Sequence, residues 1–411
     1  MPLHRHKTQA FVAVKILAAA LITLLVSSCA TPAAVRDDAA PVRAALAAEL
    51  DAILEDTGFP GITAAVVLPN GEIITAASGL ADVETNTPMN AESLMPAGSI
   101  GKTFVAATAL ALVEEGKLSL DAPIAQYLGE RDWYRDIPNG DVITLRMLLN
   151  HSSGIDVDYI SSPQILPLFV QTFGADGVAM SDLGFRYSDI VGAISNSEPD
   201  FHAGTGFAYS DANYILVGLL IEEVTGHAFY QEASTRFTER FALADTIPTP
   251  RASARFASGY EPDEETRLPG FPEKLTEDGR LYYDPALEWT GGGFASTAGD
   301  LAKWAYDLYG RRALPGDLVD EMIASRNRFV PAELGWGYGL AVQLSEDAFG
   351  LRLMHGGYIP GYSSYMEYQP ARDMALAFQT NTRSGFSANK RIADRLWHAV
   401  LDASNSTAAG N

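Results

Sequence analysis

The chain has 411 residues, 47% of them hydrophobic and 19% charged, which is typical of a folded globular protein and not of a disordered one. Its 51 Asp and Glu residues outnumber 29 Lys and Arg residues and give a formal net charge of −22 at pH 7. Because nucleic-acid phosphates select basic surfaces, this excess of negative charge argues against a nucleic-acid partner.

The first 28 residues are typical of an export signal. Three basic residues, Arg5, Lys7 and Lys15, precede an apolar run over residues 16–26. A membrane-spanning helix needs about 20 apolar residues, so this shorter run favours a cleaved signal over a permanent span. We therefore expect the chain to be exported.

The only cysteine of the chain, Cys29, follows this signal. Residues 26–29, Val-Ser-Ser-Cys, resemble a bacterial lipobox, in which small residues precede a cysteine that is acylated and becomes the new N-terminus. We expect Cys29 to be lipidated, because a lone thiol in an oxidising compartment has no other evident use; the alternative is a signal-peptidase site beside an incidental cysteine. Thr31, not Asp, follows Ala30, so the resemblance implies a lipid anchor in the outer membrane, facing the periplasm of the bacterial cell envelope.

A tether and a helix are expected next. Residues 29–41 show no apolar period and are expected to be a tether. The folded domain is expected over residues 42–401. It begins with a helix at 42–57, where apolar residues recur at helical spacing until Gly58.

Two β-rich segments follow, at residues 62–68 and 72–78. They are joined by Asn70-Gly71, whose tolerance of positive φ suits a tight hairpin. An antiparallel sheet is therefore predicted to begin here.

The middle of the chain is predicted to be helical. Residues 99–115 are apolar and rich in Ala, and Gly116 follows them, which indicates a largely buried helix with Ser99 at its start. Short helical runs, such as 145–150 and 214–225, are separated by loops rich in Pro and Gly. We therefore expect a mostly helical part over about residues 120–285.

The last third of the chain returns to strands, which are expected at residues 339–344, 351–355, 363–368 and 374–380. Ser387 offers an N-cap for a closing helix at 388–401, and 402–411 is expected to be a tail. The sheet would thus be formed from both ends of the domain, about residues 42–119 and 286–401.

One pair of residues, Ser99 and Lys102, has the spacing of a serine nucleophile and its base. Ser-x-x-Lys places the two side chains one helical turn apart, where an amine can take or hold the hydroxyl proton. A second match, Ser387 to Lys390, is explained by helix capping. Ser99 differs because an apolar helix follows it and would desolvate the lysine, although an N-cap is the structural alternative for Ser99 as well.

Two further motifs lie downstream, Tyr209-Ser210-Asp211 and His355-Gly356-Gly357. Together with Ser99-x-x-Lys102 they resemble the three-part signature of the serine β-lactamase and penicillin-binding-protein superfamily. The chain is most similar to the branch of class C β-lactamases, D-alanyl-D-alanine carboxypeptidases and related esterases. Three accessory stretches occur in the order of that family, at residues 148–155, 291–297 and 335–339.

The resemblance implies an α/β (α+β) fold in which an antiparallel sheet flanked by helices lies beside a mostly helical domain. It also implies that Ser99 forms an acyl-enzyme while Lys102 and Tyr209 share the proton transfer. The backbone N–H groups of Ser99 and Tyr358 would form the oxyanion hole. Gly356 and Gly357 would border the substrate, with Gly357 allowing it to lie close to the strand. The resemblance also makes a monomer the expected state.

His355 and Asp211 depart from the usual pattern. His355 stands where classical β-lactamases commonly have Lys, and a neutral imidazole attracts a substrate carboxylate less than a fixed cation does. Asp211 stands where the family usually has Asn, and an ionised Asp can accept hydrogen bonds but cannot donate one to a substrate carbonyl. It should also hold Lys102 protonated, which makes Tyr209 the expected base, helped by the Lys102 ammonium. Asn213 would point to a different face of a helix and is a poor substitute.

These residues favour a serine hydrolase that acts on small-molecule esters or on D-amino-acid peptides and amides, with β-lactam hydrolysis possible. One alternative is a true class C-like β-lactamase, and the other is a non-hydrolytic penicillin-binding or sensor protein, against which the intact Ser99, Lys102 and Tyr209 argue. No phosphate loop, dinucleotide fingerprint or paired metal-ligand motif is present, so no cofactor and no metal are expected.

Overall fold

The computed structural model describes residues 39–156, 160, 162–174, 176–195, 198–265 and 267–409. The expected export signal and Cys29 lie outside these residues. The described residues form one compact unit. Within the described part of the chain, no helix combines the length and the apolar character that crossing a membrane requires.

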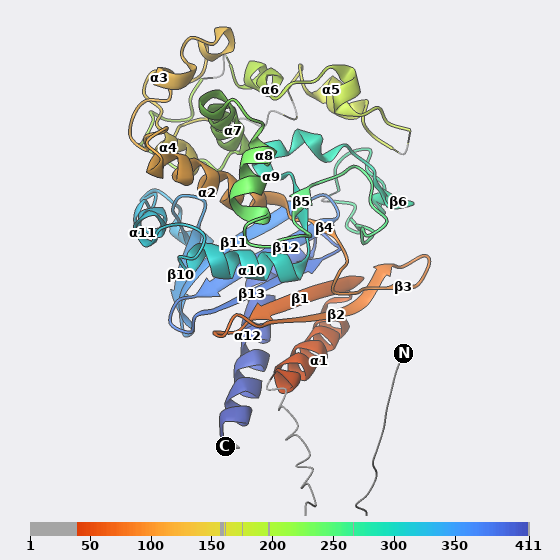
Figure 1. Ribbon diagram of the computed structural model, residues 1–411. Helices are drawn as coiled ribbons and strands as arrows, with labels where there is room; N and C mark the ends of the chain where they lie inside the picture. Colours follow the sequence, from red (N-terminus) through yellow and green to blue (C-terminus); the bar gives the residue numbers. More distant parts are fainter. Residues whose placement is uncertain are drawn as a thin grey trace, which may run out of the picture. The chain divides into compact units, whose positions relative to one another are not determined.

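An antiparallel sheet of eight strands is the centre of the fold (Figure 1), in the order β3-β2-β1-β13-β12-β11-β10-β9. The third and fourth strands in this order join the two ends of the domain, since β1 pairs with β13 in the register Ile62↔Thr380 to Val67↔Ala375. The strands are β1 (Gly61–Val67), β2 (Ile73–Asp82), β3 (Thr87–Pro88), β9 (Gly337–Tyr338), β10 (Gln343–Asp347), β11 (Gly350–Ile359), β12 (Tyr362–Gln369) and β13 (Met374–Thr380).

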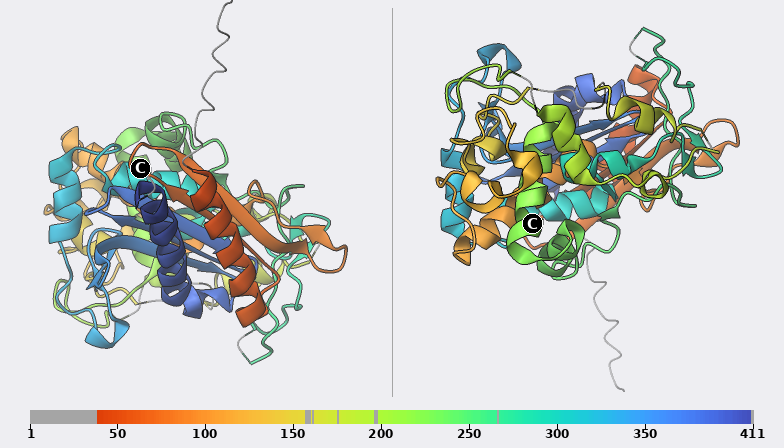
Figure 2. Two further views of the ribbon diagram at one scale, coloured as in Figure 1. Left: turned by 90° about the horizontal axis from the view of Figure 1, so that it is seen from below. Right: turned by 90° about the horizontal axis from the view of Figure 1, so that it is seen from above.

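Helices cover both faces of this sheet. On one face, α1 (Ala40–Thr57) and α12 (Gly385–Ala409) lie side by side (Figure 2). The opposite face is covered by α10 (Ala298–Tyr309), which contacts β1, β12 and β13. Every residue of β1 and β13 is buried, because neither face of these strands meets water.

The helical part lies on the α10 side of the sheet (Figure 1). It is built around α2 (Gly101–Glu114) and α7 (Asp211–Thr225), which contact each other. Shorter helices contact them: α3 (Ala125–Leu128), α4 (Leu145–Leu149), α6 (Tyr187–Ile194), α8 (Phe229–Ala233) and α9 (Trp289–Gly292). Two more short helices are α5 (Leu166–Val170) and α11 (Gly316–Ala324). Two small sheets join β4 (Met95–Pro96), β8 (Phe294–Ser296) and β5 (Ile247–Pro248), and β6 (Thr276–Glu277) with β7 (Arg280–Leu281).

The large sheet between helices confirms the predicted fold class, but some boundaries differ. The strand predicted at 339–344 is wrong over most of its length, because a turn with Ala341 at φ 55° separates β9 from β10. The closing helix starts at Gly385, so Ser387 lies inside its first turn and is not its N-cap. The same helix continues to Ala409, through most of the segment expected to be a tail.

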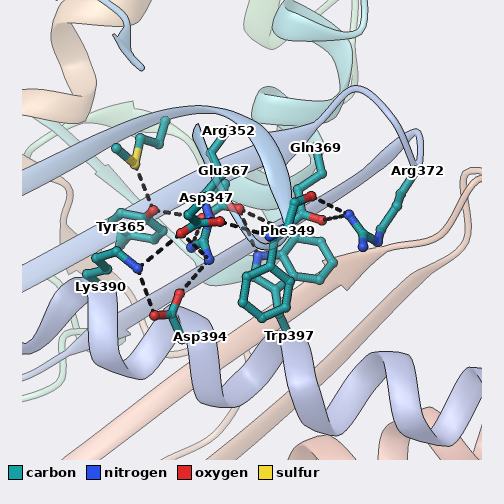
Figure 3. Close-up of polar contacts among 11 residues, drawn as sticks. Asp347, Phe349, Arg352, Tyr365, Glu367, Gln369, Arg372, Lys390, Asp394 and Trp397 are labelled. Atoms are coloured by element: carbon teal, nitrogen blue, oxygen red, sulfur yellow. Dashed lines mark hydrogen bonds and ion pairs between the residues drawn. The ribbon is translucent and has the colours of Figure 1, made fainter. Parts of the chain in front are cut away.

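A buried ionic network fastens α12 to the sheet (Figure 3). Glu367 on β12 is fully buried and accepts hydrogen bonds from Trp397 Nε1 at 2.9 Å and from Tyr365 Oη at 2.7 Å. Arg352 on β11 is 1% exposed and pairs with Glu367 at 3.2 Å and with Asp394 on α12. Charged groups such as Glu367 and Arg352 are tolerated in a core because their hydrogen-bonding capacity is filled.

We expect Trp397→Phe to lower the free energy of unfolding by about 1–3 kcal/mol, because it removes one donor from the buried Glu367 carboxylate. Urea denaturation measures this change. The control is Trp133→Phe, because no described residue accepts a hydrogen bond from the Trp133 indole. Equal losses in the two variants would contradict a role for the Trp397 hydrogen bond.

Candidate active site

Ser99 lies in a single 3₁₀ turn, Gly98–Ile100, immediately before α2. It is half-buried between the buried Gly98 and Ile100. The 3₁₀ turn and α2 both begin without a side-chain capping bond, so capping does not explain this serine. Its Oγ instead accepts a hydrogen bond from Lys102.

Gly98 allows the Ser99 turn to lie against β11. Its φ is +54°, and a Cβ on this residue would come within 2.6 Å of Tyr358 O and 2.7 Å of Tyr358 N. Only glycine fits so close an approach. The two backbone N–H groups expected to form the oxyanion hole, those of Ser99 and Tyr358, therefore belong to segments in direct contact.

Lys102 is fully buried, and its ammonium group has three close partners. Its Nζ donates to Ser99 Oγ at 2.9 Å and to the Gly291 carbonyl, and it forms an ion pair with Asp211. Burial lowers the pKa of Lys102, but the charges of Asp211 and Tyr209 outweigh it and raise this pKa above its usual value. Lys102 is therefore an ammonium in the resting enzyme, in line with the effect expected of Asp211.

Tyr209 lies beside Lys102, whose Nζ is 5.1 Å from the centre of the tyrosine ring. The residue is 36% exposed. Burial and the charge of Asp211 raise the pKa of Tyr209, and Lys102 and Ser99 lower it by less. Lys102 therefore acts on the phenol in the expected direction, but burial and the charge of Asp211 outweigh it and the pKa of Tyr209 stays above its usual value.

The third motif lies on β11, the third strand from one edge of the sheet. Pairing with β10 ends at Gln343↔Met354, so residues 355–359 extend beyond β10, where Gly356 N donates to Gln343 Oε1 at 3.2 Å. A Cβ on Gly357 would lie 1.9 Å from Ala97 O. Gly357 therefore leaves room for the carbonyl before Ser99, and its place beside the substrate stays a prediction. Gly356 borders Phe386 and Asn389 instead.

His355 is buried, with 1% of its surface exposed. Its Nδ1 lies 2.7 Å from the carbonyl oxygen of Gly356, and its Nε2 lies 2.9 Å from Tyr338 Oη. Burial, helped by the charge of Lys102, lowers the pKa of His355 to about 3. The imidazole is neutral and both nitrogens are occupied, so the predicted contact with substrate is replaced by a structural hydrogen bond at the strand.

Sequence reasoning missed Glu288, which lies just before α9. A Cβ on Gly291 would have Asp211 and Glu288 Oε2 as neighbours, at 3.4 Å and 3.8 Å. Burial raises the pKa of Glu288 to about 7, and the negative charge of Asp211 acts in the same direction. Nothing in the local sequence marks this residue, because its position beside Asp211 is created by the packing of α9 against α7.

The arrangement provides a half-buried hydroxyl, a buried amine that contacts it, a phenol and two backbone donors. These are the groups needed for nucleophilic attack on a carbonyl. Among the residues that the structure describes, no three His, Cys, Asp or Glu side chains gather into a group that could hold a metal ion.

Comparison with known proteins identifies a family for the chain. A model of the Beta-lactamase family matches residues 45–400. Esterase EstB of Burkholderia gladioli is 27% identical over 390 residues, which cover 89% of this chain and 97% of the esterase. Penicillin-binding protein 4* of Bacillus subtilis (strain 168) is 24% identical, over 70% of this chain and 60% of its own length. For this relative and several others, the chain spans less than two thirds of the matched protein.

Solved structures share the fold. A D-stereospecific amidohydrolase from Streptomyces sp. superposes with a TM-score of 0.66 at 26% identity, over 84% of this chain and 94% of that one. The D-amino acid amidase from Ochrobactrum anthropi SV3, complexed with D-phenylalanine, has a TM-score of 0.72 over 88% of this chain and 99% of that one. Its identity is 22%, and the likeness is one of fold.

Proposed function

The chain belongs to the Beta-lactamase family, and from this premise we propose that it is a serine hydrolase that forms an acyl-enzyme on Ser99. The observation that carries the proposal is the 2.9 Å hydrogen bond from the buried Lys102 Nζ to Ser99 Oγ. A lysine is buried at high cost unless its charge is compensated, and here it is placed against a hydroxyl that water can reach.

The reaction would proceed in two steps. The coupled Lys102 and Tyr209 pair first loses one proton to solvent. Ser99 Oγ then forms a bond to the substrate carbonyl carbon while its proton passes to that pair, and the N–H groups of Ser99 and Tyr358 receive the oxyanion. The leaving alcohol or amine takes that proton as its bond to the carbonyl carbon breaks. Water then attacks the acyl carbon, and the acid is released with Ser99 restored.

Esters and D-amino-acid amides are the proposed substrates. Asp211 cannot donate a hydrogen bond to a substrate carbonyl, which disfavours the amide of a β-lactam or of a peptide and makes an ester the better substrate. The names of two relatives, an esterase and a D-stereospecific amidohydrolase, agree with this choice. We also propose, from the sequence, that the mature protein is a monomer held on the outer membrane by a lipid on Cys29 and facing the periplasm.

Three chromogenic substrates test this proposal on the purified mature protein: p-nitrophenyl butyrate, D-phenylalanine p-nitroanilide and a chromogenic cephalosporin. We expect turnover of the ester and slower turnover of the D-amino-acid anilide, with the cephalosporin the poorest of the three. Cephalosporin as the best substrate would favour a class C-like β-lactamase. Covalent labelling by penicillin without turnover of any substrate would favour a penicillin-binding or sensor protein.

A further inference from the structure

The accessory stretch 148–155 contains a histidine to which the proposed reaction assigns no role. His151 follows α4 and is fully buried. Its φ is +59°, a left-handed conformation that is strained for a residue other than glycine. A strained residue persists only where its surroundings fix its conformation. The contacts of His151 therefore show which residues it is fixed against.

His151 contacts three successive residues centred on Tyr209. Its backbone carbonyl accepts a hydrogen bond from Ala208 N at 3.1 Å, and its Nδ1 accepts one from Ser210 N at 3.2 Å. Between these two bonds, the imidazole lies against the Tyr209 ring, with the ring centres 4.2 Å apart and the planes inclined by 32°. The backbone on both sides of Tyr209 and the ring of Tyr209 are therefore fixed by one residue.

The imidazole itself is held in one orientation. Asn213 on α7 places Nδ2 3.2 Å from His151 Nδ1, and its Oδ1 accepts a hydrogen bond from Ser153 Oγ at 2.6 Å. Burial and the charge of Lys102 lower the pKa of His151 well below its usual value. The ring is therefore neutral, with Nδ1 as the acceptor and the proton on Nε2.

We propose that His151 is a positioning residue that holds Tyr209 in register with Ser99 and Lys102. The inference rests on the proposed proton role of Tyr209. His151 is too deeply buried to touch substrate, so it acts through Tyr209 and its loss slows the chemical step. A small displacement of a reacting group can cost roughly 10²-fold in rate.

Two substitutions separate the hydrogen bond that His151 Nδ1 accepts from Ser210 N from the ring contact with Tyr209. His151→Asn keeps an acceptor near Nδ1 and tolerates the left-handed backbone, but it removes the stacked ring. His151→Phe keeps a ring and leaves Ser210 N without its acceptor. His227→Asn is the matched control, because the His227 side chain is 55% exposed.

We expect kcat on p-nitrophenyl butyrate to fall by about 10- to 10²-fold in His151→Phe, with KM little changed and a smaller loss in His151→Asn. Thermal unfolding shows whether each variant is folded. A merely structural role would reduce the active fraction and the melting temperature without changing kcat per active site, which titration with an active-site phosphonate measures.

A double-mutant cycle with Tyr209→Phe tests the route of the effect. If His151 acts through Tyr209, then His151→Phe should cause no further loss of kcat in the Tyr209→Phe background. The inference would be overturned if the kcat losses of the two single variants multiplied in the double variant. It would also be overturned if the His151 variants changed only KM. If both His151 variants keep the wild-type kcat while Tyr209→Phe is slow, only the inference about His151 is overturned. If Tyr209→Phe itself keeps the wild-type kcat, the proposed proton role of Tyr209 is overturned as well.

Discussion

Ser99→Ala should lower kcat/KM for p-nitrophenyl butyrate by about 10⁴- to 10⁶-fold, the range typical of loss of a catalytic nucleophile. The substitution removes the one side-chain atom that both accepts a hydrogen bond from Lys102 and is positioned beside the expected oxyanion donors. The oxyanion hole would remain, so the residual rate should still exceed that in water.

The second Ser-x-x-Lys match gives the control for this substitution. Ser387→Ala makes the same chemical change in a serine with the same spacing from a lysine, Lys390. We expect its kcat/KM to equal that of the wild type. Comparable losses in both variants, or a residual rate above about 10% for Ser99→Ala, would contradict the role of Ser99.

Asp211→Asn should move the acid limb of the pH profile of kcat/KM to lower pH. Asp211 raises the pKa of Lys102 and also that of Tyr209. Because either group must lose its proton before it can accept one from Ser99, both assignments of the base predict the same direction. Removing the charge of a contacting carboxylate shifts a pKa by about 1–3 units. At pH values below the acid limb, kcat/KM should therefore rise by about 10- to 10³-fold.

The profile is measured with the p-nitrophenyl ester between pH 5 and pH 10 and corrected for ionisation of the product. Asp132→Asn, at an exposed position, is the control. The asparagine also restores a donor to a substrate carbonyl, so cephalosporin turnover should gain more than ester turnover. An acid limb that stays in place, or moves to higher pH, would show that Asp211 does not set the protonation of this pair.

Local patterns in the sequence predicted much of the fold. The helical spacing of apolar residues before Gly58 is found in α1, and Asn70-Gly71 lies between β1 and β2 as expected. The boundaries at β10 and α12 were missed because turn geometry at Ala341 and the packing of α12 on the sheet decide them. Neither is visible in a short window of residues.

Residue chemistry and residue spacing predicted the contact between Ser99 and Lys102 and the effect of Asp211 on the lysine. Other features depend on distant packing. Glu288 and His151 reach the site only because α9 and the loop after α4 fold against α7 and its N-terminal segment. The effect of Lys102 on the pKa of Tyr209 has the predicted direction, but the larger effect of burial depends on packing and cannot be judged from the sequence.

Intact-protein mass spectrometry of the acyl-enzyme tests the central claim most directly. The mature protein is mixed with a slowly deacylating p-nitrophenyl ester, quenched in acid within the first turnover and compared with Ser99→Ala. We predict a mass increase of one acyl group on the wild type, located on the peptide that contains Ser99, and none on the variant. An equal adduct on both proteins, or hydrolysis with no covalent species at any time, would contradict an acyl-enzyme on Ser99.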